Sequence, residues 1–353
     1  MDKSSMDFLL TLLNTPSPSG SEEDIQRKWL HYTKPFADEQ RADGAGNAIS
    51  IINPEGALKI MLAGHCDEIG FMVKEIDADG YIRVEKLGGI SHKPALGMKV
   101  DILGDKEIVT GVFGVDAEHQ GGTGDGFSFS DLFIDCGASN REEIAKLISI
   151  GDTAVYHRSP ELLFGNKISG RGLDNRTGAF IAAETIKRLK QKTFPSSVAA
   201  VSTVNEETNM GGAYYAGAAF QPDLAIVIDV TFAYDYPGSN RGGQPEVKLG
   251  GGPVLALGPP VNKKAGHGLK KAAEKEGINI QYELTPRQTG TDADKIRYTG
   301  SGITTVNVSL PLRYMHSPVE TASLEDIEDV ITLLAAYIED LGADTSFKPL
   351  ILD

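Results

Sequence analysis

Four short apolar runs constrain the fold of this chain more than any other feature. They are rich in Val, Ile and Ala, contain few polar positions and have the length of strands; they occupy residues 58–63, 198–204, 224–228 and 304–310. Strands that are buried on both faces have this composition, as in a parallel or mixed sheet covered by helices. The runs therefore predict an α/β fold with a mixed sheet between helices.

Helical patterns lie between and around these runs. Residues 5–35 predict a helical start, with a capping-box pattern at residues 21–24. A run of good helix formers over residues 175–190 follows Asp174 and places that carboxylate at a helix N-terminus, where it is electrostatically favoured. Residues 323–341 predict a helix capped by Ser323 with apolar residues at helical spacing.

The composition changes between residues 73 and 165. Here short alternating segments are separated by glycines, and the turn signal at residues 77–80 precedes a strand-like segment. We expect a small β-rich domain at residues 73–165, inserted into an α/β domain formed by residues 1–72 and 166–353. Within it, residues 117–130 are Gly-rich and polar and predict a mobile surface loop.

Composition narrows the classes of partner. The 353 residues fit two domains, and the net charge of −15 argues against a nucleic-acid backbone as partner. No apolar run is long enough for a membrane helix, and the N-terminus lacks the features of a signal peptide. Only Cys66 and Cys136 are present, too few for a disulfide framework or a thiolate zinc site, so we expect a cytoplasmic protein.

Acidic and histidine residues fall at or just beyond the ends of the four predicted core strands. They are His65, the pair Glu206 and Glu207, Asp229 and His316. Open α/β sheets form their sites at the carboxyl edge of the strands, so these side chains are expected to converge.

Each of these residues also has a structural explanation when taken alone. Asp174 could simply cap its helix, the two glutamates could be a solvated pair, and His65 could be a core histidine. Asp229 favours function, because a carboxylate inside an apolar run is expensive to bury unless it is paired or bound to metal. Asp67 lies on the same face of an extended segment as His65, where it could orient a ligand.

Two histidines with several carboxylates and no cysteine suit Zn²⁺ or Co²⁺, with Mn²⁺ as an alternative. A site with two metals that performs hydrolysis is the natural use of such a set. No HExxH motif occurs in the chain, which excludes the single-zinc protease helix as the source of ligands.

Five motifs in this order and spacing resemble the glutamyl and tetrahedral aminopeptidase family of metallopeptidases with two cocatalytic metals. The motifs are GHCDEIGFMV, GRGLDNRTGAF, NEETNMGGA, VIDVT and RYMHSPVE, and the similarity spans nearly the whole chain. The third motif departs from the family pattern after its two glutamates, which changes the expected wall of the specificity pocket.

The resemblance implies a role for each candidate residue. His65 and Asp229 would bind one metal ion, Glu207 and His316 the other, and Asp174 would bridge the two ions. Glu206 would be the general base.

The resemblance also implies catalytic support from Asp67, which would hold the first metal site from behind, and a cis peptide after Asp174. The inserted domain would be a β-barrel similar to PDZ modules that serves assembly, with a homo-oligomer, a dodecamer built from dimers, as the expected state. The substrates would be peptides with a free N-terminus.

Two other functions stay open at this point. Adjacent acidic residues also suggest a glycoside hydrolase of the endoglucanase type, although one Trp and 7% aromatic residues provide little material for stacking on sugars. A non-catalytic metal-binding assembly scaffold is the second alternative. The preferred N-terminal residue, the native metal and the role of the loop at residues 117–130 are not determined by the sequence.

Overall fold

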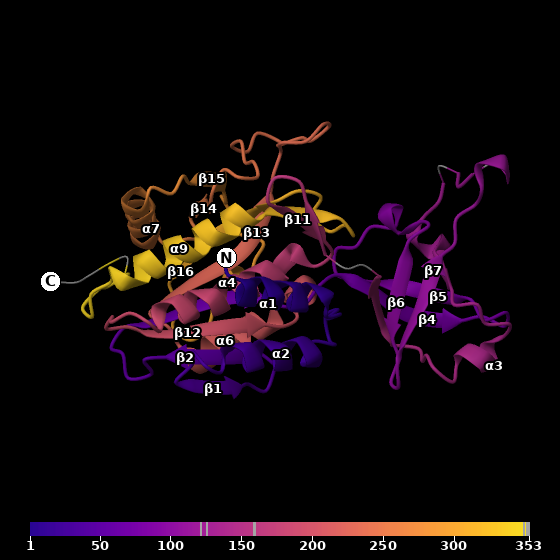
Figure 1. The fold of residues 1–353 in the computed structure, drawn as a ribbon, viewed down its shortest axis with the longest axis horizontal. Coiled ribbons are helices and arrows are strands. Elements are labelled where there is room, and N and C mark those ends of the chain that lie inside the picture. The colour runs from indigo at the N-terminus through magenta and orange to yellow at the C-terminus, as the bar shows by residue number, and fades with distance from the viewer. Residues whose placement is uncertain (121, 125, 158–159, 349, 351–353) are drawn as a thin grey trace.

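The structure is a computed structural model that describes residues 1–120, 122–124, 126–157, 160–348 and 350. An eight-stranded mixed sheet forms its larger part (Figure 1). In spatial order the strands are β1 (Glu39–Ala42), β2 (Ala48–Ile52), β12 (Ser197–Thr203), β3 (Lys59–His65), β13 (Leu224–Phe232), β16 (Thr305–Leu312), β14 (Val254–Leu257) and β15 (Gln281–Leu284).

The four apolar runs form the centre of this sheet. They are β12, β3, β13 and β16, which are adjacent and parallel, whereas β2 and β14 pair antiparallel at the two sides. The prediction of a mixed sheet with strands buried on both faces is therefore confirmed.

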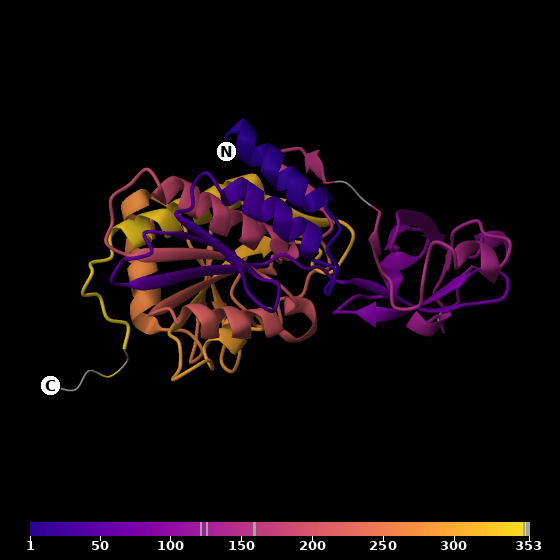
Figure 2. The same ribbon diagram turned by 90° about the horizontal axis from the view of Figure 1, so that it is seen from below.

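Helices cover both faces of the sheet, as the view from below also shows (Figure 2). One face packs against the larger hydrophobic cluster and the other against a smaller one. The larger cluster includes residues of α1 (Lys3–Asn14), α2 (Glu23–Thr33), α4 (Leu173–Leu189), α7 (Lys263–Glu276) and α9 (Leu324–Glu339), and the smaller includes residues of α6 (Gly211–Phe220) and α8 (Ala293–Ile296).

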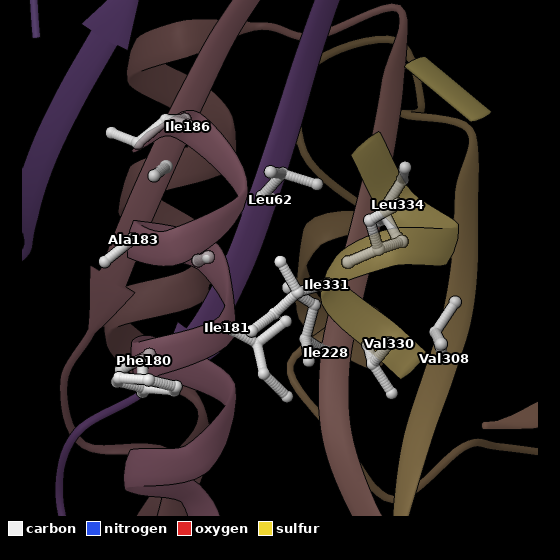
Figure 3. Packing of buried hydrophobic residues seen from close by; sticks show 14 of the residues in the cluster. Leu62, Phe180, Ile181, Ala183, Ile186, Ile228, Val308, Val330, Ile331 and Leu334 are labelled. Atoms are coloured by element: carbon white, nitrogen blue, oxygen red, sulfur yellow. The ribbon is translucent and has the colours of Figure 1, made fainter. Parts of the chain in front are cut away.

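The core on the larger side joins side chains of the sheet with those of α4 and α9. Figure 3 shows Leu62, Ile228 and Val308 of the sheet beside Ile181 of α4 and Ile331 of α9. All five side chains are at most 1% exposed. Burial of such side chains contributes roughly 1.5–3 kcal/mol each, which fixes α4 and α9 against the sheet.

The second part of the structure is a closed six-stranded antiparallel barrel with its own core (Figure 1). It confirms the expected small β-barrel. In spatial order its strands are β4 (Gly70–Ile76), β5 (Ile82–Leu87), β8 (Phe133–Asp135), β7 (Ile108–Phe113), β6 (Lys99–Leu103) and β9 (Thr153–Tyr156). The exact domain limits at residues 73 and 165 stay a prediction.

Short elements complete the structure. A small sheet pairs β10 (Glu161–Leu163), β11 (Lys167–Gly170) and β17 (Glu320–Ser323), and the barrel carries η1 (Lys93–Ala95), η2 (Glu118–Gln120), η3 (Phe129–Asp131) and α3 (Arg141–Ile144). Two positions of the predicted loop at 117–130, Gly121 and Asp125, lie outside the described residues. Among the described residues, no helix is long and apolar enough to span a membrane.

One detail of the helix predictions was wrong: residues 21–24 do not form a capping box. The predicted helical start at residues 5–35 covers most of α1 and all of α2, and the chain between Thr15 and Glu22 lies outside both helices. Glu22 caps α2 without a side-chain hydrogen bond to the helix, since its carboxylate instead accepts from the backbone of Asn205. The cap at Ser323 is confirmed: its side chain accepts a hydrogen bond from the backbone N–H of Glu325.

Candidate active site

The predicted site residues come from separate elements and meet at the carboxyl edge of the sheet. His65 ends β3, Glu206 and Glu207 begin α5 (Glu206–Asn209) after β12, and His316 lies between β16 and β17. Asp229 differs from the prediction, because β13 continues to Phe232 and so places this residue inside the strand rather than at its end.

Asp174 lies between the two histidines. Its Oδ1 is 3.3 Å from His65 Nε2, and its Oδ2 is 3.4 Å from His316 Nε2. Glu207 Oε2 lies 3.5 Å from the same atom of His316, and Asp229 Oδ1 lies 3.9 Å from His65 Nε2. The two oxygens of one carboxylate thus face two different groups of side chains.

Close packing of α4 brings Asp174 to this place. A Cβ on Gly64 would lie 2.4 Å from the backbone of Gly178, and a Cβ on Gly178 would lie 2.6 Å from the carbonyl oxygen of Ile228. Only glycine permits these approaches, so the start of α4 lies directly against β3 and β13. The peptide bond after Asp174 is cis, as expected.

Asp67 holds the turn that carries the two glutamates. Its Oδ1 accepts the backbone N–H of Glu206 at 3.0 Å, and its Oδ2 accepts that of Glu207 at 3.2 Å. The hydroxyl of Ser19 donates to Oδ2 at 2.6 Å. His65 Nδ1 lies 3.0 Å from the backbone oxygen of Asp67, which fixes the orientation of the imidazole.

Glu320 is a positioning residue that the sequence reasoning missed. Its carboxylate accepts the backbone N–H of Asp174 at 3.1 Å and that of His316 at 2.9 Å. The side chain is buried in β17 and links two candidate ligands that are distant in sequence. The available signal was its place at the end of the motif RYMHSPVE, as an acidic residue entering a strand.

The cluster contains more negative than positive charge. Burial raises the pKa of Glu206 to about 9, with the neighbouring Asp229 adding to the rise and His65 opposing it. Burial likewise raises the pKa of Glu207 and of Asp229 well above the ordinary carboxyl range. Carboxylates crowded in this way require cations or protons to balance them.

The pKa values of Asp174 and His65 are instead shifted in the directions that favour their charged forms. Burial acts to raise the pKa of Asp174, but hydrogen bonds with His316 and His65 lower it. Burial alone would lower the pKa of His65, but Glu206, Asp174 and Asp67 raise it well above its usual value. The centre of the cluster therefore favours ionised carboxylates beside the imidazoles.

The donor set suits divalent metal ions. Two groups of donor atoms each lie within 4.8 Å of one another: His65, Glu206 and Asp229, and His65, Asp174 and Glu207. Glu207 Oε1 is buried without a hydrogen-bond partner in the described part of the chain. Nitrogen and carboxylate oxygen ligands at this spacing match the coordination chemistry of Zn²⁺ and related ions.

A cleft of about 900 Å³ opens over the cluster. Its walls come from the end of β13, from residues 244–247 and from residues 282–298. None of the other described histidines joins the cluster; His119 in η2 is exposed on the barrel.

Imidazoles and carboxylates that converge in a cleft at the carboxyl edge of an α/β sheet are typical of metal-assisted hydrolases. The comparison with known proteins gives the family. The chain belongs to the M42 glutamyl aminopeptidase family, whose profile matches residues 46–333. The protein is therefore a hydrolase, an aminopeptidase.

Relatives match over nearly the full chain. The lysyl aminopeptidase of Pyrococcus furiosus is 33% identical, over 95% of this chain and 97% of its own. An aminopeptidase from the archaeon Desulfurococcus kamchatkensis has the same fold with a TM-score of 0.91, 30% identity and 99% coverage of both chains. The TET1 peptidase of Pyrococcus horikoshii, which can assemble into a tetrahedron or a large octahedral shell, matches with a TM-score of 0.85 and 31% identity over 96% of this chain and all of that one.

Proposed function

We propose that this aminopeptidase removes N-terminal residues from peptides with two divalent metal ions. His65 and Asp229 would hold one ion, Glu207 and His316 the other, and Asp174 would contact both. The observation that carries the proposal is the placement of the two Asp174 oxygens, 3.3 Å from one imidazole and 3.4 Å from the other. The unpartnered Glu207 Oε1 is a further donor atom free for a cation.

Glu206 is the proposed general base. Its side chain is 9% exposed, and its Oε2 lies 3.7 Å from His65 Nε2 at the floor of the cleft. The carboxylate would take a proton from the attacking water and deliver it to the departing amine. When bound, the metal ions would polarise the scissile carbonyl and make water more acidic.

Asp67 and Glu320 would position the base and the metal ligands through backbone hydrogen bonds. Asp67 accepts the backbone N–H groups of Glu206 and Glu207 and so fixes the short segment that carries both carboxylates. Glu320 does the same for the backbone of Asp174 and His316.

The rival functions are less well supported. Histidines among the carboxylates favour metal binding over the simple carboxylate pair of a glycosidase. The one tryptophan, Trp29, is fully buried and donates its indole N–H to the backbone of Ala179, so it does not form a surface for sugars. A non-catalytic scaffold would not need Glu206, which binds no metal under the assigned roles.

Metal removal is expected to abolish peptide hydrolysis. Protein treated with a chelator should lose hydrolysis of aminoacyl anilides and regain it when Zn²⁺, Co²⁺ or Mn²⁺ is added back. Elemental analysis should find two ions per chain in the active form. Full activity after stripping, or hydrolysis of a soluble cellulose derivative instead of anilides, would contradict the proposal, and two bound ions without any peptide hydrolysis would favour the scaffold.

We also propose that the enzyme works in the cytoplasm as a homo-oligomer, a dodecamer built from dimers. An apolar hairpin supports the assembly: Leu162 is 60% exposed, Leu163 45% and Phe164 101%. Exposed apolar side chains that adjoin one another commonly mark protein interfaces. Closed symmetric assemblies are also the usual form of soluble oligomers.

Replacing Phe164 by serine is expected to shift the assembly toward smaller species in light scattering. Tyr215→Ser is the matched control, because Tyr215 is 58% exposed on α6, away from this hairpin. A wild-type protein that stays a monomer of 37.7 kDa with metal present would contradict assembly. Dissociation of the Tyr215 variant alone would assign the contact to α6.

A further inference from the structure

We propose that Glu283 selects substrates whose N-terminal residue carries an ammonium side chain, lysine in particular. The inference rests on the proposed function, because it names the substrate class of that site. Family membership does not determine the preferred N-terminal residue, because the family is named after glutamyl aminopeptidase whereas one relative is a lysyl aminopeptidase.

Glu283 lies in the cleft wall beside the catalytic cluster. Its strand, β15, is at the edge of the sheet, and the side chain reaches across β14 to β16 and β13. Its Oε1 accepts the hydroxyl of Ser309 at 2.9 Å, and its Oε2 accepts the hydroxyl of Thr231 at 2.5 Å.

Both partners place this carboxylate close to Asp229. Ser309 is the register partner of Asp229 on the neighbouring parallel strand, and neighbouring strands lie about 4.8 Å apart. Thr231 is two residues beyond Asp229 and so points to the same face of the sheet. A substrate whose terminal residue is held at the cluster would extend a side chain along this wall, and the four-carbon stem of lysine suits that span.

The charge of Glu283 has no balancing cation. Its hydrogen-bond donors are the two hydroxyls and, at 3.5 Å, the amide of Asn307. Within the described ranges, no nitrogen of Lys, Arg or His lies within 4.0 Å of its carboxylate. Burial raises the pKa of Glu283, and the three hydrogen bonds to its carboxylate only partly oppose this rise.

A substrate ammonium group would supply what this carboxylate lacks. Two carboxylate oxygens offer about four acceptor positions, so capacity remains after the existing hydrogen bonds. An ammonium group has three donors and a full positive charge, and pairing offsets the burial of both charges. A neutral side chain of the same length would leave the carboxylate uncompensated.

Two cationic side chains also line the cleft, and they would favour substrates with an acidic N-terminal residue if they determined the selectivity. Arg287 and Lys295 are exposed, and no ion pair joins either to Glu283. Exposed charges are screened by solvent and contribute little to selection, whereas Glu283 is partly buried and hydrogen-bonded to Thr231 and Ser309. We therefore assign the selectivity to Glu283 rather than to the two cations.

The test compares lysyl and norleucyl anilides, whose side chains have nearly the same length and differ in the ammonium group. The metal-loaded wild-type enzyme should cleave the lysyl substrate with a kcat/KM about tenfold or more above that for norleucyl. Glu283→Gln should lower kcat/KM for the lysyl substrate by about tenfold to a hundredfold, the usual contribution of a charged hydrogen bond. The norleucyl rate should change less than about twofold, which also shows that the variant folds.

Two further variants control for general charge effects. Glu246→Gln removes the same charge from an exposed residue that does not line the cleft, although its neighbours Pro245 and Val247 do, and it should leave the lysyl preference unchanged. Arg287→Gln should leave the lysyl preference unchanged or increase it. Equal cleavage of both substrates by the wild type, an unchanged ratio in Glu283→Gln, or a preference for glutamyl anilide that Arg287→Gln removes would each overturn the inference. Failure to cleave any anilide would instead contradict the proposed function.

Discussion

Glu206→Gln is expected to lose turnover by roughly 10² to 10⁴, the contribution usual for a general base, while it keeps the metal content of the wild type. Glutamine has the size and polarity of glutamate but cannot accept the proton of the attacking water. The backbone hydrogen bond of residue 206 to Asp67 does not involve the side chain, so the turn should remain intact. Rate and elemental analysis on the same preparation measure both expectations.

Glu207→Gln provides the contrast, because Glu207 is proposed to bind metal whereas Glu206 is proposed to act as the base. It removes the proposed anionic ligand beside His316, so it should weaken binding of one metal ion, and excess metal should restore part of the activity. The two variants change adjacent residues by the same chemistry and share the support of Asp67. Loss of metal in the Glu206 variant, with full metal and no turnover in the Glu207 variant, would exchange the two roles.

The centre of the sheet could be predicted from sequence because its signal is local. A strand buried on both faces is apolar at nearly every position, and each of the four runs became a central strand. Their common parallel direction then brings the residues that follow them to one edge. The convergence of His65, Glu206 and His316 therefore followed from strand ends alone.

The residues that the sequence did not identify depend on contacts between distant segments. Glu320 acts through two backbone N–H groups, one of them 146 positions away, and its sequence neighbourhood shows only an acidic residue. Glu283 of β15 contacts Thr231 of β13 across 52 positions, and β16 and β14 lie between these two strands in the sheet. Asp229 was placed at a strand end because its run of apolar residues stops there, although the strand continues through Phe232.

Glu68 is a further buried carboxylate behind the site, and it pairs with two arginines. Its buried carboxylate accepts from Arg171 at 2.5 Å, from Arg176 and from the backbone of Ser17 at 3.1 Å. Arg176 lies in α4, two residues after Asp174, and is fully buried. This network joins the N-terminal segment, the loop after β3 and the start of α4.

Glu68→Gln is expected to destabilise the folded protein by about 3–5 kcal/mol, because it leaves two buried guanidinium groups without a counter-charge. Burial acts to raise the pKa of Glu68, but Arg171 and Arg176 outweigh it and lower the pKa in the folded state. A lowered carboxyl pKa stabilises the fold above the unfolded value of about 4.3 and loses this effect as pH falls through the folded value. The difference between wild type and variant should therefore be constant between about pH 6 and pH 8.

Denaturant unfolding followed by the fluorescence of Trp29 measures this difference, because that side chain is buried against α4. Both proteins are compared at one concentration, since assembly adds stability that depends on concentration. Glu85→Gln is the matched control: its ion pair with Lys74 lies on the barrel surface, with side chains 49% and 62% exposed. The control should unfold at the same midpoint as the wild type. If Glu68→Gln did so too, the buried network would not hold the start of α4, and the position of Asp174 would have to depend on Glu320 and the glycine contacts alone.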